Sequence, residues 1–391
     1  MINLKIRSAS FTRVATIAIV LVSLGMSGCG KKDENVIKIG VITPLSGEGA
    51  TYGAATKRGV DLALEEINNS GGVRNRQIQV IYEDSQIDPS EGTKAIQKLI
   101  NVDKVSVIIG AFGSSVSLAI SPIAERSKVV LFSASSTADE LKEAGDYFFR
   151  NVPTNSAQGQ SAADFAVDVL EAQSAAILYM NNDYGISLTK SFKNRFENSG
   201  KAIQLVENYN PGDRDFRSQI TKIIASRSDV VFYPGHYQES GIILKQAREM
   251  GLNIPFIGGD GSYSPNLIAI AGTAAENSYY TLMAMGFGIS DEKIENYNEA
   301  YFQKYGMQSD VYSAYAYDAL HLIVNAIERG GLSSEDIKNA LYSTKGFRGI
   351  TGITTFDSDG EVDKPFYIYK VQNGEFVLAS QELTDLYPKF K

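Results

Sequence analysis

Short runs of apolar residues alternate with longer amphipathic stretches along the chain after residue 35. The apolar runs are mostly continuous, which is typical of parallel strands that are covered on both faces of a sheet. We therefore predict strands at residues 36–42, 78–82, 105–109, 129–132, 175–180, 230–233 and 254–257.

The stretches between these runs carry the apolar periodicity of helices. In one of them Val60, Ala63 and Ile67 share a helical face, and charged residues occupy the other. Strand–helix alternation of this kind predicts right-handed βαβ units and parallel sheets. Two such runs, at about 36–150 and 158–275, predict two α/β lobes.

The last third of the chain has a different pattern. It predicts helices at 291–305, 311–329 and 333–343, followed by a strand–turn–strand around 356–360. No segment rich in proline, glycine or serine separates the two α/β runs. We therefore expect short crossings between the lobes rather than a flexible linker.

Length and charge narrow the possible functions. The chain has 391 residues, enough for two domains, and a formal charge of −8. It has no basic stripe that could neutralise a row of phosphates, so no nucleic-acid partner is expected.

The N-terminal segment predicts export. Residues 14–26 are nearly all apolar or small, a run shorter than the roughly 20 residues that span a bilayer. Positive charges precede this run, and no acidic residue occurs before residue 29. This pattern is typical of a secretory signal peptide, here residues 1–28. The positive residues are Lys5, Arg7 and Arg13.

Cys29 ends the sequence Met26-Ser27-Gly28-Cys29, which resembles the lipobox at which bacterial lipoproteins are cleaved and acylated. It is the only cysteine, so no disulfide can form within the chain. We predict a lipoprotein with its lipid at Cys29, a tether over 29–35, and anchoring at a membrane in the periplasm or at the cell surface. The alternative is a plain signal peptide followed by an incidental cysteine.

Ligands of doubly wound sheets bind beyond the carboxyl ends of the strands, where helix N-termini present free N–H groups. Two predicted strands lead there into loops of small and hydroxyl residues, which suit a carboxylate or a phosphate. The alternative is that the hydroxyls cap helices, with Thr137 and Glu140 forming a capping box. The loop residues are Gly113, Ser114, Ser115, Ser135, Ser136 and Thr137.

Polar residues also follow predicted strands in the second half of the chain. Tyr184, His236 and Asp260 each lie a few residues after a strand end. An aspartate flanked by Gly259 and Gly261 is not expected to have a packing role. It would suit a buried ammonium group, which must be paired when it is desolvated. The alternative is an ordinary turn aspartate.

The known sequence motifs for nucleotide binding, catalysis and metal binding are incomplete or absent. Gly47, Gly49 and Gly53 mimic a dinucleotide-binding fingerprint, but Pro44 interrupts the strand–helix join that this fingerprint needs. Only two histidines are present, no G-x-S-x-G nucleophile elbow occurs, and residues 357–360 lack the spacing of a calcium loop. We therefore predict no catalytic residues, no metal site and no cofactor, with an exported enzyme as the alternative.

Several segments resemble, in their order and spacing, periplasmic binding proteins of the branched-chain amino acid (Leu/Ile/Val) family. The resemblance implies a type I periplasmic binding protein, in which two Rossmann-like lobes with mainly parallel sheets are joined by three hinge crossings. It places 36–155 and 284–365 in lobe 1, and 156–283 and 366–391 in lobe 2. The segments are 39–47 with 52–53, 66–68 with 71–73, 82–85 with 88–89, 110–115, 135–137, 183–185 and 258–261.

The resemblance also implies how the two ends of an amino acid would be bound. Ser114 and Thr137 would bind the α-carboxylate. The carbonyl of Ser135 and the carboxylate of Asp260 would bind the α-ammonium. Tyr184 would close over the ligand from the second lobe.

At the side-chain end, the resemblance implies that Tyr52 and Tyr312 line the site. His236 stands where the family often has a tyrosine, and Gly113 stands where its enteric members have a disulfide cysteine. The chain would then be a monomeric substrate-binding protein that delivers an amino acid, branched-chain or otherwise aliphatic, to an ABC permease. The alternative is a binding or sensor protein of the same fold for a short amide, urea or an organic acid.

Overall fold

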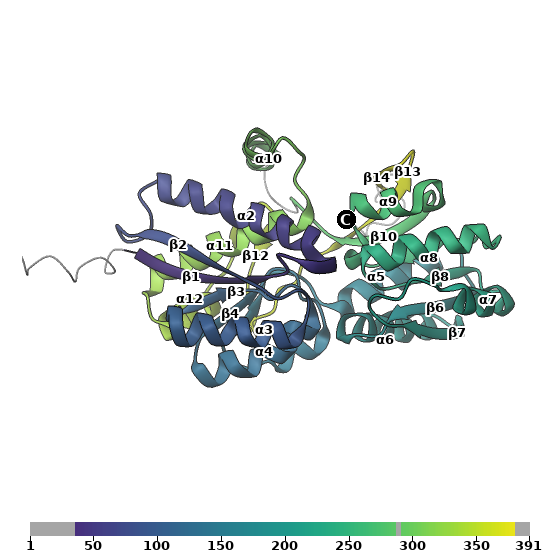
Figure 1. Cartoon of the computed structure of the whole chain (residues 1–391), viewed down its shortest axis with the longest axis horizontal. Coiled ribbons are helices and arrows are strands. Elements are labelled where there is room, and N and C mark those ends of the chain that lie inside the picture. The colour runs from purple at the N-terminus through teal and green to yellow at the C-terminus, as the bar shows by residue number, and fades with distance from the viewer. Residues whose placement is uncertain (1–35, 287–290, 380–391) are drawn as a thin grey trace, which may run out of the picture.

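The computed structural model describes residues 36–286 and 291–379, and these form two α/β lobes that lie side by side (Figure 1). The predicted signal peptide, Cys29 and the tether fall within residues 1–35, outside the described residues, and so do residues 380–391. None of the helices in the described ranges has the length and apolar character needed to cross a membrane.

Lobe 1 is built on a five-stranded parallel sheet in the order β2-β1-β3-β4-β5. Its strands are β1 (Val36–Thr43), β2 (Gln77–Asp84), β3 (Val107–Ile109), β4 (Val130–Ser133) and β5 (Phe148–Arg150). Its helices are α2 (Ala50–Asn69), α3 (Pro89–Lys98), α4 (Ser114–Ser127), α10 (Asp291–Tyr305), α11 (Val311–Gly330) and α12 (Ser334–Tyr342).

The central strand β1 explains why the predicted strands are continuous apolar runs. Ile39 and Val41 pack into one hydrophobic core and Ile42 packs into another, and all three are fully buried. A strand that is covered on both faces can be apolar at successive positions.

Lobe 2 is built on a seven-stranded sheet in the order β14-β13-β10-β9-β8-β6-β7, in which β13 runs antiparallel to both its neighbours. Its strands are β6 (Ser174–Met180), β7 (Ala202–Tyr209), β8 (Val230–Phe232), β9 (Phe256–Gly258), β10 (Ser278–Met283), β13 (Phe366–Gln372) and β14 (Glu375–Leu378). Its helices are α5 (Asn155–Asp168), α6 (Asp183–Asn198), α7 (Arg217–Ser226), α8 (Tyr237–Glu249) and α9 (Pro265–Ala271).

The chain passes between the lobes three times, after β5, after β10 and after β12. The strand–turn–strand predicted around 356–360 is wrong in its strands. A turn is present, because the N–H of Asp357 donates to the carbonyl of Glu361 at 3.0 Å. However, residues 355–365 form the third crossing, and the short hairpin precedes it, as β11 (Phe347–Gly349) and β12 (Gly352–Thr354).

The glycines that mimic a dinucleotide fingerprint have a packing role. Gly53 lies in α2, and a Cβ atom there would be 1.7 Å from the carbonyl oxygen of Pro44. The helix therefore lies directly against the backbone that leaves β1, and only glycine leaves room for that contact.

We expect Gly53→Val to destabilise the folded protein by about 3 kcal/mol, because the new side chain must push α2 away from Pro44. Thermal unfolding followed by circular dichroism measures this. Ala54→Val is the matched control, since Ala54 is the next residue of the same helix and is exposed. Equal unfolding temperatures for the two variants would contradict the close-packing role.

Candidate functional site

A cavity of about 670 Å³ lies between the two lobes, and we call it the interlobe cavity. Its walls include the loops that follow β3, β4, β6, β8 and β9, so it lies at the carboxyl ends of the strands, as doubly wound sheets predict. Eight of the ten predicted ligand-binding residues line it. They are Tyr52, Gly113, Ser114, Ser135, Tyr184, His236, Asp260 and Tyr312.

Ser114 presents a free hydroxyl proton. Its Oγ accepts the backbone N–H of Ala138 at 3.1 Å, so its own O–H can donate elsewhere. The helix-capping alternative is wrong, because the N-cap of α4 is Gly113 and no side chain caps this end. Gly113 has φ of +90°, a left-handed conformation that favours glycine.

Thr137 is fully buried behind the cavity-lining Ser135 and is not itself among the residues that line the interlobe cavity; its Oγ1 has no hydrogen-bond partner among the described residues. The predicted capping box is wrong. The segment after Thr137 is the 3-10 helix η3 (Asp139–Glu143), whose N-cap is Ala138 and has no side-chain cap. An unpaired hydroxyl at this depth is costly unless a partner arrives.

Ser136 faces away from the interlobe cavity. Its hydroxyl donates to the carbonyl of Ala111 at 2.9 Å and lies 2.9 Å from the hydroxyl of Ser117. Ser136 therefore holds the two hydroxyl-rich loops of lobe 1 together. The same stretch of sequence supplies both a structural hydroxyl and cavity-lining residues.

Asp260 is one of two buried carboxylates that line the interlobe cavity; the other, Glu239, accepts the backbone N–H of Gly212 at 2.9 Å. Asp260 is 3% exposed, and no lysine or arginine of the described chain forms an ion pair with it. Its carboxylate accepts the hydroxyl of Tyr184 at 2.8 Å. Burial raises the pKa of Asp260, because the charged form is desolvated. A cation placed beside it would remove that cost.

The glycines around Asp260 make room for Tyr184. A Cβ atom on Gly259 would lie 2.3 Å from the tyrosine hydroxyl. That hydroxyl also accepts the N–H of Gly261 at 3.1 Å. The glycines therefore let the ring of Tyr184 lie directly over the 3-10 helix η4 (Asp260–Ser262) that carries the carboxylate.

Aromatic faces form the opposite wall of the interlobe cavity. Tyr52 stacks on Phe112 with 4.6 Å between ring centroids, and Tyr312 contacts both rings edge-on at 5.3 Å. The hydroxyls of Tyr52 and Tyr312 are engaged, because they donate to the carbonyls of Gly261 and Asp260. This part of the cavity therefore offers apolar ring surface. Phe112 was not predicted as a site residue, although it too follows β3.

His236 adds a neutral ring to the site. It is the N-cap residue of α8, and its ring lies 6.2 Å from that of Tyr184 and 5.9 Å from that of Tyr52. Burial lowers the pKa of His236 to about 4, because the charged imidazolium is desolvated. It is therefore uncharged at neutral pH and does not compensate Asp260.

The lobes contact each other at the mouth of the interlobe cavity. Glu48, in lobe 1, forms an ion pair with Arg214 of lobe 2. Its carbonyl accepts hydrogen bonds from Tyr237 at 3.3 Å and from Gln238 at 3.1 Å. None of these four residues was predicted, because their contacts join segments about 170 to 190 positions apart.

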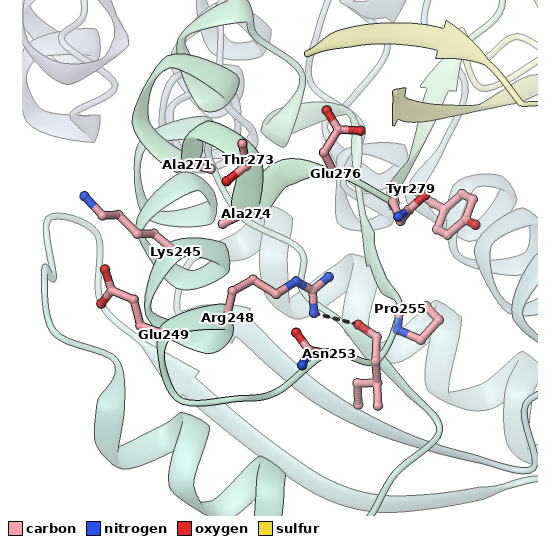
Figure 2. Close-up of a pocket in the computed structure, with 12 residues that line it drawn as sticks. Lys245, Arg248, Glu249, Asn253, Pro255, Ala271, Thr273, Ala274, Glu276 and Tyr279 are labelled. Atoms are coloured by element: carbon pink, nitrogen blue, oxygen red, sulfur yellow. Dashed lines mark hydrogen bonds between the residues drawn. The ribbon is translucent and has the colours of Figure 1, made fainter. Parts of the chain in front are cut away.

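A second cavity, of about 710 Å³, lies on lobe 2 beside α8 and α9 (Figure 2). It is at the amino ends of β9 and β10, the wrong edge of the sheet for a ligand site of this fold. Arg248 donates there to the carbonyls of Leu252 at 2.6 Å and Ile254 at 3.0 Å. Its guanidinium thus fixes the turn before β9, and none of the predicted ligand-binding residues is near.

The described part of the chain contains no group of three or more His, Cys, Asp or Glu side chains that could hold a metal ion. The lining of the interlobe cavity therefore combines two buried carboxylates, those of Asp260 and Glu239, with hydroxyl groups and aromatic faces. Such a set can bind and orient a small molecule with a positive and a negative end.

Comparisons with known proteins agree with this arrangement. A family model described as periplasmic binding protein matches residues 36–375. The chain is 30% identical to a leucine-, isoleucine-, valine-, threonine- and alanine-binding protein of Pseudomonas aeruginosa, over 86% of this chain and 90% of that protein.

Two solved structures share the fold. The leucine-binding protein LivK of Thermotoga maritima has a TM-score of 0.84 and 30% identity, covering 88% of this chain and 97% of that one. The branched-chain amino acid transporter substrate-binding protein LivJ of Streptococcus pneumoniae, solved with isoleucine, has a TM-score of 0.82 and 33% identity, with coverage of 87% and 97%. The two-lobed α/β fold predicted from the sequence is confirmed.

Proposed function

The chain belongs to the periplasmic binding protein family, and we propose that it captures an amino acid in the interlobe cavity and delivers it to an ABC permease. The observation that carries this proposal is the buried carboxylate of Asp260, which has no cationic partner among the described residues. The α-ammonium group of an amino acid is the cation that fits beside it.

The opposite charge of a zwitterion would meet the hydroxyl donors of lobe 1. Ser114 has a free proton, and the buried Thr137 lacks a partner in the described chain. Hydrogen bonds to a charged carboxylate are stronger than bonds between neutral groups. An organic acid without an ammonium would instead bring a second negative charge towards Asp260, which opposes its binding.

The aromatic faces support an aliphatic side chain. Tyr52, Phe112 and Tyr312 offer ring surface, and the hydroxyls of the two tyrosines are already bonded to the protein. The relatives agree with this class, since the Pseudomonas protein is named for leucine, isoleucine, valine, threonine and alanine. We propose leucine, isoleucine or valine as the first ligands to test.

Titration calorimetry of the purified mature protein tests the proposal. We expect heat with at least one of leucine, isoleucine and valine, and none with isovalerate, which lacks the ammonium group. Binding of a short amide or urea in place of every amino acid would favour the alternative use of the fold. The absence of heat with all twenty amino acids would overturn the proposal.

We also propose how the chain is divided into a signal peptide and two lobes. Residues 1–28 would be removed after export, and lobes of 36–155 with 284–365 and 156–283 with 366–391 would open and close about the three crossings. A monomer is proposed, since the two lobes of a single chain enclose the interlobe cavity.

We expect Cys29→Ser to release the exported protein from the membrane, because it removes the sulfur that would carry the lipid. Fractionation of cells that express the full-length chain, followed by immunoblotting, measures the soluble share. Ser27→Ala is the control, because it keeps the cysteine and a small residue before the cleavage site. Persistent membrane association of the Cys29→Ser variant would contradict the lipid anchor.

A further inference from the structure

Arg150 is the largest fully buried side chain of the described chain, and it lies behind the loop that carries Thr137. It is the last residue of β5 and pairs with Ser133 of β4 in the sheet. Its guanidinium has both a charged and a neutral set of partners. A buried cation persists only with such partners.

One side of the guanidinium binds the loop that carries Thr137. Nη1 donates to the carbonyl of Ser136 at 3.1 Å and to that of Ala138 at 2.8 Å. These two carbonyls flank Thr137 on either side. The carbonyl of Thr137 itself accepts the N–H of Asn155 at 2.7 Å. The backbone is therefore fixed at three successive residues, which sets the direction of the unpaired Thr137 hydroxyl.

The other side of the guanidinium binds the third crossing. Nε lies 2.9 Å from Oε1 and 2.8 Å from Oε2 of Glu361, and Nη2 donates to Oε2 at 2.6 Å. The backbone N–H of Arg150 also donates to the carbonyl of Gly360 at 3.2 Å. Glu361 supplies the negative charge that the carbonyls lack. A bidentate pair of this kind is strongly directional.

Ser114 is linked to the same loop. Its Oγ accepts the N–H of Ala138, the residue whose carbonyl Arg150 holds. A shift of the loop would therefore move both hydroxyls assigned to the ligand carboxylate. Lysine could not reproduce this arrangement, because it lacks the planar fork that reaches a carboxylate and two carbonyls together.

We infer that Arg150 is a positioning residue for the carboxylate end of the bound amino acid, and that Glu361 couples it to the crossing between the lobes. The inference rests on the proposed function. Arg150 acts through Thr137 and Ser114; of these three residues only Ser114 lines the interlobe cavity.

Calorimetry with L-leucine, L-isoleucine and L-valine on the mature wild-type protein comes first, and no heat with any of them would count against the proposed function. The tightest of the three then serves as the probe. We expect Arg150→Lys to weaken its binding by about 10- to 100-fold, because hydrogen bonds to a charged carboxylate lose their geometry. Glu361→Gln, which keeps one acceptor and the shape of the side chain, should lose less. Unchanged affinity in Arg150→Lys would overturn the inference and leave the proposed function standing.

A control variant separates positioning from general destabilisation. Lys364 lies in the same crossing, is also buried, and donates to Thr351 at 2.9 Å, away from the interlobe cavity. We expect Lys364→Met to bind the probe like the wild type even where its melting temperature falls. An equal affinity loss in Lys364→Met would show that the Arg150 effect is only loss of stability.

A double-mutant cycle tests the route. If Arg150 acts through Thr137, adding Arg150→Lys to Thr137→Val should cost little further affinity. Combined with Tyr312→Phe, which alters the opposite end of the site, the two fold-losses should multiply. If the affinity losses of Arg150→Lys and Thr137→Val multiply in the double variant, Arg150 does not act through Thr137. Should Arg150→Lys fail to fold, Glu361→Gln replaces it in both cycles with the same expected pattern.

Discussion

Replacing Asp260 with alanine should weaken amino-acid binding by about 2–5 kcal/mol, because it leaves the ligand's ammonium buried without a counter-charge. The side chain is 3% exposed, so water cannot easily take over its role. Calorimetry with the amino acid that the wild type binds most tightly measures the loss. Asp260→Asn should lose a similar amount, since an amide keeps the shape and removes the charge.

Asp183→Ala is the control for Asp260, because Asp183 also lines the interlobe cavity but is exposed to solvent. Its charge is screened by water, so its loss should change the affinity little. Equal losses in the Asp183 and Asp260 variants would mean that the cavity attracts cations only through its general charge. The ammonium assignment would then be wrong.

The raised pKa of Asp260 gives binding a pH dependence with a definite sign. In the free protein, the carboxyl group takes up a proton at a higher pH than an ordinary aspartate. An ammonium beside it favours the charged form, so ligand binding lowers its pKa and expels that proton. The affinity should therefore be constant above the raised pKa and should fall as the pH is lowered through it.

His236 does not interfere with this measurement, because its pKa of about 4 keeps it neutral through the window above that value. Glu239 also lines the cavity, and burial raises its pKa as well, so Asp260→Asn should remove only the part of the pH dependence that belongs to Asp260. A pH dependence that is unchanged in this variant would assign the titration to another group.

Replacing Thr137 with valine should weaken binding by about 1.5–3 kcal/mol, the usual worth of a hydrogen bond to a charged group. The expected effect on stability has the opposite sign. Thr137 Oγ1 is buried without a partner in the described chain, so exchanging the hydroxyl for a methyl removes an unpaired polar atom. The free protein should melt at the same temperature or higher while it binds more weakly.

Thr189→Val is the matched control for Thr137. Thr189 lies in α6, is buried, and also has an Oγ1 without a hydrogen-bond partner among the described residues, but it belongs to a helix of lobe 2 and not to the loop that carries the cavity-lining Ser135. Differential scanning calorimetry and titration calorimetry on both variants separate stability from binding. Similar binding losses in the two variants would remove Thr137 from the site.

Ser114→Ala extends the test to the other hydroxyl. It should weaken binding by a similar amount, and it should also destabilise the free protein by about 1 kcal/mol, because the N–H of Ala138 loses its acceptor. The two substitutions should therefore change stability in opposite directions, because Ser114 Oγ accepts a hydrogen bond in the free protein and Thr137 Oγ1 has no partner among the described residues.

Much of the fold could be predicted from the sequence, because a buried parallel strand must be a short apolar run. All seven predicted strands occur, with bounds shifted by a few residues. Two of the strands that were not predicted lack this signal. β7 is at a sheet edge and alternates between exposed and covered residues, and β13 pairs antiparallel with β10 from about 90 positions further along the chain.

The position of the candidate site could be predicted from the sequence, since polar residues after strands must gather at one edge of each parallel sheet. Which of these residues face the interlobe cavity depends on the packing of distant segments. Ser136 faces away from it because Ala111 and Ser117 lie behind that loop, and Phe112 enters because Tyr52 stacks on it. The pairing of Arg150 with Glu361 joins residues 211 positions apart. Local sequence patterns carry backbone preferences, whereas such contacts depend on how distant segments pack.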